Sequence, residues 1–188
     1  MATKKNFYAH DIPELDDLIK RCNVILADLE TKPRYRFKDL FERKKNYFEL
    51  NGSQFKEIGF NYISDGETMK IYSDIQGVYI FYENNIPVYV GISRRISNRL
   101  RHHFIGNNHF QASLAFLKAR EKWDSQNGLY KGLRRDFPFD DYRHEIQSQM
   151  MENFEIQIIP ETCSFTRAML EIMIASKYQV YWNSFETH

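Results

Sequence analysis

The chain has 188 residues, with 26 Lys and Arg, 25 Asp and Glu, and two cysteines. This length is typical of one core domain, with or without an appendage, and it is enough to bury a sizeable core. Apolar residues make up 43% and charged residues 27% of the chain, which excludes a disordered or fibrous protein. The net charge is only +1, but the charge is unevenly distributed along the chain.

No apolar run approaches the roughly 20 residues of a membrane helix, and the first ten residues lack the apolar core of a signal peptide. Cys22 and Cys163 are far apart and form no C-x-x-C pair. This argues against a disulfide framework and against a zinc site built on paired cysteines. We therefore expect an intracellular, cytoplasmic protein with no membrane partner.

The first 76 residues predict an N-terminal addition made of a helix, a basic segment and a hairpin. Residues 12–30 carry apolar side chains at 3/4 spacing, which predicts an amphipathic helix capped by Asp11. A short basic helix is expected over 37–48. Residues 57–63 and 67–72 resemble two strands joined by a Ser-Asp-Gly turn.

From residue 77 onward the expected order is hairpin, two helices, strand and helix, with residues 141–151 as a further candidate helix before the strand. The ranges are, in that order, 77–82 with 88–91, 93–104, 111–123, 141–151, 153–159 and 164–178. This order predicts an α+β domain over residues 77–188, with a three-stranded, mainly antiparallel sheet flanked by helices. Residues 1–76 are expected to pack on that domain.

Basic residues gather in two segments of the chain. Residues 32–45 hold seven basic and two acidic side chains among Tyr35, Phe37 and Phe41, and residues 94–103 hold four Arg and two His with no acid. Basic side chains mixed with aromatic rings suit a polyanion with stackable bases, although a solvated helix face gives the same pattern. The candidate phosphate contacts are Arg34, Arg36, Lys38, Lys44, Lys45, Arg94, Arg95 and Arg101.

The predicted helix after the hairpin carries an apolar stripe of Ile96, Leu100 and Phe104. Arg99 and His103 flank this stripe as an i,i+4 pair. An Arg and a His that are half-buried on one line would form a preorganised anion site. The plain alternative is an Arg stem that covers apolar surface and a histidine in the core boundary.

Glu171 stands inside the apolar run 169–175 of the last helix. A buried carboxylate is costly unless it is paired or bound to a metal. The nearest partner in sequence is Arg167, one turn back. The functional alternative is a ligand for a hard cation such as Mg²⁺, which accepts one or two carboxylates with water and phosphate oxygens.

The hairpin carries Tyr79 near Gly77 on one strand and Tyr89 near Gly91 on the other. Glycine in a strand permits the close approach of another element or of a ligand. Tyrosines on a hairpin usually serve packing, but a phenol in an electropositive site can act as a general base or hydrogen-bond a reacting water.

In combination and in this order, these features resemble the GIY-YIG nuclease superfamily. The paired motifs are GVY at 77–79 and YVG at 89–91, with valine in place of both isoleucines. Ile92 stands where many relatives have a polar residue, so that Ser93, Arg94 or Arg95 would supply any helper there. The family's further functional positions correspond to Arg99, His103, Glu171 and Asn183.

The resemblance implies metal-dependent hydrolysis of a nucleic-acid phosphodiester, with one Mg²⁺ or Mn²⁺ held by Glu171. Tyr79 would act as general base toward the attacking water, and Tyr89 would hydrogen-bond the scissile phosphate or the water. The sequence does not decide which tyrosine has which role. The expected products carry a 5′ phosphate and a 3′ hydroxyl.

The other three positions would support this chemistry. Arg99 would stabilise charge on the phosphoryl oxygens. His103 would relay a proton or hold Tyr79, and Asn183 would position Glu171 or the phosphate.

We expect a restriction- or defence-type endonuclease that acts on double-stranded DNA, because no large recognition or repair domain is attached. A structure-specific or repair nuclease is the nearest competitor, and a homing-type enzyme is less favoured. A catalytically silent nucleic-acid-binding module on the same fold is the alternative outside enzymes. A monomer would nick DNA, whereas a homodimer could cut both strands. A zinc protein would have to use ligands that match no standard spacing: His102, His103, His109 and Cys163.

Overall fold

The computed structural model describes residues 12–64 and 70–183 of the chain. The strands of its central sheet are β1 (Arg34–Arg36), β6 (Gly77–Glu83), β7 (Ile86–Ser93) and β8 (Phe154–Pro160). They form a four-stranded antiparallel sheet in the order β1-β8-β6-β7. The predicted α+β class is confirmed, but the sheet has four strands instead of three. The extra strand, β1, is too short to give a period-2 signal in the sequence.

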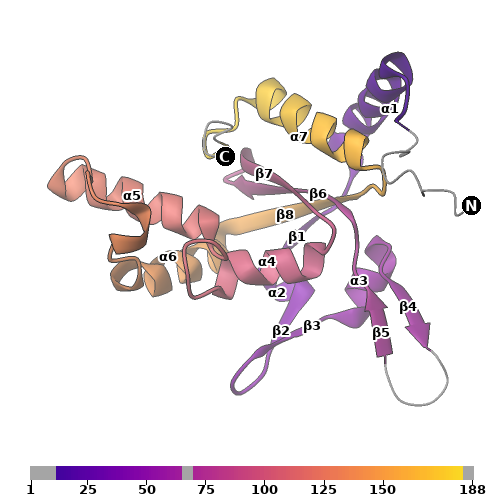
Figure 1. The fold of residues 1–188 in the computed structure, drawn as a ribbon. Coiled ribbons are helices and arrows are strands. Elements are labelled where there is room, and N and C mark those ends of the chain that lie inside the picture. The colour runs from indigo at the N-terminus through magenta and orange to yellow at the C-terminus, as the bar shows by residue number, and fades with distance from the viewer. Residues whose placement is uncertain (1–11, 65–69, 184–188) are drawn as a thin grey trace, which may run out of the picture.

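Helices lie on both faces of this sheet, and two small hairpins extend from it (Figure 1). The helices are α1 (Leu15–Ala27), α2 (Phe37–Leu40), α3 (Gly52–Ile58), α4 (Ile96–Ile105), α5 (Ser113–Asn127), α6 (Asp140–Asn153) and α7 (Ser164–Tyr178), with 3-10 turns η1 (Leu29–Thr31) and η2 (Arg134–Asp136). The hairpins pair β2 (Phe41–Arg43) with β3 (Phe48–Leu50) and β4 (Asn61–Ser64) with β5 (Lys70–Ser73). None of the helices within 12–64 and 70–183 is long and apolar enough to cross a bilayer.

Strand β6 separates two cores by the alternation of its side chains. Val78 and Ile80 are buried in one core, together with residues of α1 and α7 that include Leu18, Cys22, Leu170 and Ile174. Tyr79 and Phe81 are buried in the other core, with α4 residues Ile96, Leu100 and Phe104. Helices α4 and α7 therefore cover opposite faces of the sheet (Figure 1).

The β6–β7 hairpin turns at Asn84 and Asn85, which both have positive φ, at 53° and 65°. Two successive residues in this region match a type I′ turn, whose twist suits a hairpin. The turn pairs Tyr79 with Gly91 across the strands. Pro87 is tolerated within β7 because β7 lies at the edge of the sheet.

The basic helix predicted over 37–48 is wrong beyond its first turn. Helix α2 ends at Leu40, and the chain continues as the β2–β3 hairpin. Phe37 and Phe41 are 2% exposed and stack at 4.8 Å between ring centroids, so they belong to the core and offer no surface for bases. Their burial fixes the chain direction at α2 and outweighs the helical preference of the basic residues that follow.

The strand predicted over 57–63 is also corrected at its beginning, because residues 52–58 form α3. Asn51 caps this helix, with its side-chain oxygen accepting from the Gln54 N–H, and Gly59 ends it at φ 122°. The predicted cap Asp11 and the predicted turn after Ser64 lie outside the described residues. Within the described part of α1, Glu14 occupies the N-cap without a side-chain bond.

The segment that precedes β6 packs on the rest of the molecule from two sides. β1 adds to the sheet beside β8, and α1 packs against α7. Arg21 on α1 donates to both carboxylate oxygens of Glu161, which is buried after β8, at 2.9 and 3.1 Å. A bidentate pair of this kind fixes the orientation of α1 as well as its position. The division into an addition over 1–76 and a domain over 77–188 stays a prediction.

Candidate active site

Four of the predicted site residues meet on the α4 face of the sheet. The Tyr79 hydroxyl lies 2.8 Å from Nε2 of His103, and Nε of Arg99 donates to the same hydroxyl at 3.4 Å. The Tyr89 ring centroid is 6.2 Å from that of Tyr79 and 5.3 Å from that of His103. Two strands and one helix thus bring two phenols, an imidazole and a guanidinium together.

The apolar stripe of α4 explains this arrangement. Ile96 and Leu100 are fully buried against the sheet, so the i+3 and i+7 positions after Ile96 also turn toward it. These positions are Arg99 and His103. His103 is 0% exposed, whereas Arg99 remains half-buried and can meet a ligand from solvent.

Burial governs the protonation of the cluster. It raises the pKa of the Tyr79 phenol well above its ordinary value, with a smaller rise from Tyr89 and an opposing effect of Arg99. It lowers the pKa of His103 well below its ordinary value, and Arg99 and His102 lower it further. At neutral pH the phenol and the imidazole are therefore both uncharged, and Arg99 is the cation of the cluster.

The depressed pKa of His103 predicts a loss of stability in mild acid. Below about pH 6.5 the unfolded chain protonates this histidine and the folded chain does not, so the free energy of unfolding falls as pH falls. The slope from this one group approaches about 1.4 kcal/mol per pH unit. Urea unfolding between pH 7.5 and 5 measures it. His103→Gln, which cannot titrate, should give a flatter profile, and an equal slope in both proteins would contradict the assignment.

The chain from Phe110 to the first residue of α5 holds Arg99 in place, a role that the sequence analysis did not predict. Nη1 of Arg99 donates to the carbonyl oxygens of Phe110 and Gln111 at 3.3 and 3.1 Å, and its Nη2 donates to Oγ of Ser113 at 2.9 Å. Together with the bond to Tyr79, these contacts fix the plane of the guanidinium. These contacts could not be predicted from the sequence, because every residue has a backbone carbonyl. A single serine is also too common to indicate a residue that positions an arginine.

The glycines of the two motifs have a steric reason. A Cβ on Gly91 would collide with the Tyr79 hydroxyl and lie 2.6 Å from its Cζ. A Cβ on Gly77 would collide with the carbonyl oxygen of Ile159 on β8 and lie 3.1 Å from Cδ1 of Ile96 on α4. The two glycines thus admit the Tyr79 phenol and the close approach of β8 and α4.

Replacing Gly91 with alanine is therefore expected to destabilise the protein by about 1–3 kcal/mol, the usual cost of overpacking. The Tyr79 ring cannot move aside without loss of stability, because it is buried and its hydroxyl is hydrogen-bonded to His103. Gly52→Ala is the matched control, because its Cβ would have no atom within 4 Å, and its stability should change by no more than about 0.5 kcal/mol. Thermal or urea unfolding compares the two variants. Equal stability would contradict the steric role of Gly91.

Asn183 lies at the outer edge of β7. Its side-chain oxygen accepts from the Val90 N–H and its side-chain nitrogen donates to the Val90 carbonyl, both at 2.8 Å. The Trp182 N–H donates to the Val88 carbonyl at 3.1 Å. Asn183 thus satisfies the backbone of the edge strand between Tyr89 and Gly91. Its predicted role toward Glu171 or a phosphate stays a prediction.

Glu171 lies on α7, which covers the face of the sheet opposite to Tyr79, and its side chain is half-buried. Nη1 of Arg167, one turn earlier, donates to the side chain of Gln76 and to the carbonyl oxygens of Glu161 and Thr162. Arg167 therefore holds the segment before α7 in place and ties it to Gln76, the residue before β6. The role of Glu171 as a metal ligand remains a prediction.

Glu171 as a single carboxylate ligand fits a hard divalent cation that keeps most of its water ligands. Within residues 12–64 and 70–183, no group of three or more His, Cys, Asp and Glu side chains could enclose an ion. A single carboxylate suits Mg²⁺ or Mn²⁺, which keep several waters and complete their shell with substrate phosphate oxygens. The same finding leaves the zinc alternative without a set of ligands in the described residues.

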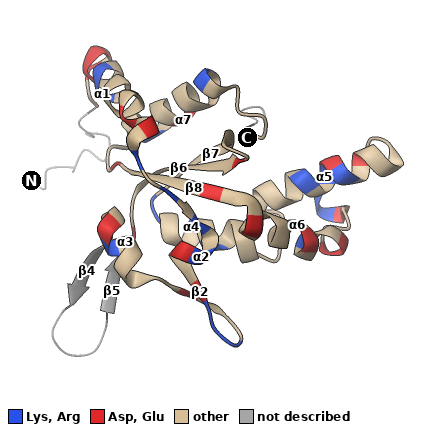
Figure 2. Cartoon of the chain, turned by 180° about the vertical axis from the view of Figure 1, so that it is seen from behind, with Lys and Arg blue, Asp and Glu red and all other residues tan. Residues whose placement is uncertain are grey.

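The predicted phosphate contacts do not form one patch. The Arg34 guanidinium lies 3.7 Å over the Tyr82 ring and donates to Asn85, so β1 already uses it. Lys44 pairs with Glu42 and Glu49 at 2.7 and 3.3 Å, on the basic loop of the β2–β3 hairpin (Figure 2). The other exposed residues of the set are Arg36, Lys38, Lys45, Arg94, Arg95 and Arg101.

Comparison with known proteins bears on this cluster directly. Residues 75–167 match the family model of the GIY-YIG catalytic domain, a segment that includes Tyr79, Tyr89, Arg99 and His103 and ends before Glu171. A solved structure of the GIY-YIG N-terminal endonuclease domain of UvrC from Thermotoga maritima, a point mutant bound to its catalytic divalent cation, is 21% identical. The match covers 60% of this chain and 86% of the UvrC domain chain, with a TM-score of 0.32. No curated protein gives a significant match. Over residues 75–167 the chain thus resembles the GIY-YIG nuclease superfamily, and the match to its catalytic domain supports an endonuclease.

Proposed function

We propose that this chain is a metal-dependent endonuclease that hydrolyses double-stranded DNA, of the restriction or defence type. The observation that carries the proposal is the hydrogen-bonded cluster of Tyr79, His103 and Arg99 inside the segment matched to a GIY-YIG catalytic domain. A silent binding module on this fold would have no need of a buried phenol bonded to a neutral imidazole beside a guanidinium.

Arg99 is proposed to bind the scissile phosphate. Its guanidinium is half-buried and held by backbone carbonyls, so it meets the phosphoryl oxygens with little reorganisation. Glu171 would hold one Mg²⁺ or Mn²⁺, which supplies Lewis-acid polarisation of a phosphoryl oxygen and of the leaving 3′ oxygen. Asn183 is proposed to keep β7 straight beside this site through its two bonds to Val90.

The two tyrosines differ in burial, which supports different roles. Tyr79 is 1% exposed and bonded to His103, whereas Tyr89 is half-buried. We assign the general base to Tyr79: it takes a proton from the attacking water as its own proton passes to Nε2 of His103. This relay avoids a standing phenolate at a site where burial opposes it. Tyr89 then hydrogen-bonds the phosphate or the water.

The experiment that tests the function uses three labelled substrates with Mg²⁺: supercoiled plasmid DNA, a linear DNA duplex and an RNA duplex. A restriction-type enzyme should give discrete DNA fragments with 5′ phosphate ends and leave RNA intact. A smear of products, or cleavage only at branched or unpaired sites, would instead indicate the structure-specific or repair type. Binding without cleavage of any substrate would contradict the nuclease and support the silent module. The ratio of nicked to linear plasmid distinguishes a monomer from a dimer.

A further inference from the structure

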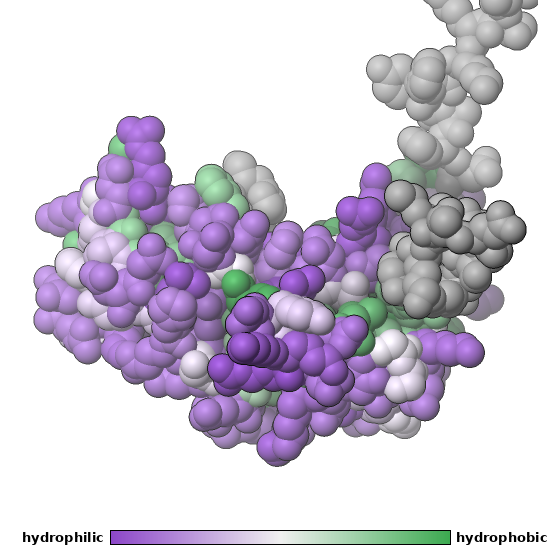
Figure 3. All heavy atoms as spheres, turned by 90° about the horizontal axis from the view of Figure 1, so that it is seen from below, coloured by the Kyte–Doolittle hydropathy of each residue, from purple (hydrophilic) through white to green (hydrophobic). Residues whose placement is uncertain are grey.

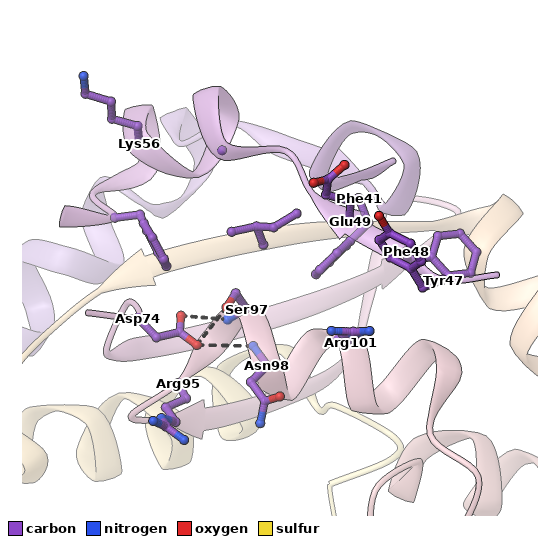
Figure 4. A pocket seen from close by; sticks show the side chains of 13 residues that line it. Phe41, Tyr47, Phe48, Glu49, Lys56, Asp74, Arg95, Ser97, Asn98 and Arg101 are labelled. Carbon is purple, nitrogen blue, oxygen red and sulfur yellow. Dashed lines mark hydrogen bonds between the residues drawn. The ribbon is translucent and has the colours of Figure 1, made fainter. Parts of the chain in front are cut away.

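A cleft with a volume of about 790 Å³ lies between α4 and the chain that precedes β6 (Figure 4). We call it the α4 cleft. Its walls come from the β2–β3 hairpin, from α3 and from the exposed flank of α4. The lining residues that matter here are Tyr47, Phe48, Lys56, Arg95, Asn98 and Arg101. On the face of the molecule seen from below, apolar surface shows between hydrophilic side chains (Figure 3).

The α4 cleft is separate from the catalytic cluster. Successive residues of a helix are about 100° apart, so Ser97 and Arg101 lie on the flank of α4 that faces away from Arg99. Asn98 lies beside that flank, and Arg95 stands at the N-cap of the helix. The two sites therefore share one helix and use opposite flanks of it. Because helix α4 is rigid, a substrate strand bound in the α4 cleft would be held at a fixed position relative to the cluster of Tyr79, Arg99 and His103.

The aromatic wall of the cleft is suited to stacking. Tyr47 is 55% exposed on the β2–β3 hairpin. The neighbouring Phe48 is half-buried and packs edge-on against Phe37, with 5.2 Å between ring centroids. Phe48 is thus fixed by the core, and Tyr47 offers a free ring beside it at the mouth of the cleft (Figure 4). A flat, exposed ring beside a fixed one is a platform for a planar group.

The charge of the cleft favours an anion. Both of its carboxylates are already engaged: Asp74 accepts from the Ser97 hydroxyl at 2.8 Å and from two N–H groups at the start of α4, and Glu49 pairs with Lys44. The opposing cations are Lys56, Arg95 and Arg101, which make no ion pair with any side chain described in residues 12–60 and 74–183. Uncompensated cations beside aromatic rings match a nucleotide.

We propose that the α4 cleft binds an unpaired nucleotide of the substrate strand, with its base on Tyr47 and Phe48 and its phosphates on Arg95 and Arg101. The inference rests on the proposed nuclease function. Within that function it favours the structure-specific type over the restriction type, because a duplex presents an unpaired nucleotide only at an end or at an unpaired site. The size of the cleft is that of a small-ligand pocket, so it accommodates one or two nucleotides and no duplex. A paired base hides its faces in the stack, whereas an unpaired base exposes one to Tyr47.

Fluorescence anisotropy tests the proposal on two labelled DNAs in EDTA: a blunt duplex and the same duplex with a four-nucleotide overhang. The wild-type chain should bind the overhang DNA more tightly. Tyr47→Ala should weaken overhang binding by about 5- to 150-fold, the range for loss of one stacked base, and change blunt-duplex binding by less than twofold. Tyr47→Phe retains the ring and should bind like the wild type. Because Tyr47 is exposed, all three proteins should fold alike, and circular dichroism checks this.

The charged wall has its own matched pair of variants. Arg101→Ala should weaken overhang binding and reduce the slope of log Kd against log salt by about 1, whereas Arg135→Ala, an exposed arginine on η2, should change neither. Equal binding of the overhang by wild type and Tyr47→Ala overturns the proposal. Failure of this proposal can be told apart from failure of the nuclease function. If only the cleft proposal is wrong, the protein still cleaves plasmid. If only the nuclease function is wrong, the protein does not cleave plasmid but still shows Tyr47-dependent binding.

Discussion

Replacing Glu171 with alanine is expected to reduce DNA cleavage by about 10³-fold or more, because polarisation of the phosphate by a metal is worth several kcal/mol in the transition state. Glu171 is half-buried on α7, within the apolar run 169–175, and it is the proposed ligand of the ion. Single-turnover cleavage of a labelled duplex with Mg²⁺ measures the loss.

Two further variants make this prediction specific. Glu171→Gln keeps the size of the side chain and loses its charge, so it should be as inactive as Glu171→Ala if metal binding is the role. Glu145 is an exposed glutamate on α6 that pairs with Lys122, and Glu145→Ala should cleave at the wild-type rate. A Glu171→Ala protein that is folded and cleaves at more than a tenth of the wild-type rate would rule out Glu171 as the metal ligand.

Replacing Arg99 with alanine is the second large effect, with an expected loss of about 10³-fold in the rate of the chemical step. Arg99→Lys should recover little of it. The guanidinium reaches Tyr79, two loop carbonyls and Ser113 at once, and an ammonium group on a flexible stem cannot repeat that geometry. The single-turnover rate at saturating protein separates this effect from weaker binding.

Arg135→Ala provides the control for charge, because it removes a surface arginine without touching the cluster. Its rate should equal that of the wild type. A smaller loss is expected for Ser113→Ala, since two backbone carbonyls still hold Arg99. If Arg99→Lys were as active as the wild type, the phosphate would need only a charge at this position, and the proposed fixed guanidinium would be wrong.

The sequence predicted the elements with long, regular patterns and missed those made of short ones. Strands β6, β7 and β8 and helix α7 carry clear alternation or an apolar run, and they lie where predicted. β1 has three residues and gains its structure from pairing with β8, a contact more than 100 residues away that local pattern cannot report. The β2–β3 hairpin likewise depends on the burial of Phe37 and Phe41 in a core formed by distant elements.

The candidate site was predictable where side chains carry it. Tyr79, Tyr89, Arg99 and His103 were all singled out from their types and spacing, and the structure brings them together. The loop carbonyls that hold Arg99 were not predictable, since every residue has a carbonyl and only the fold aims it. Tyr47 and Lys56 line the α4 cleft only because tertiary packing brings their elements next to α4. The sequence alone therefore could not predict the cleft.

The central claim is that the cluster of Tyr79, His103 and Arg99 belongs to a metal-dependent DNA endonuclease. The most direct test is the rate of supercoiled plasmid cleavage as a function of Mg²⁺ or Mn²⁺ concentration, for the wild-type chain and for Arg99→Ala. We predict a rate that rises from zero in EDTA to saturation for the wild type, and no detectable rate for the variant. Cleavage that persists in EDTA, or that is equal in both proteins, would contradict the account.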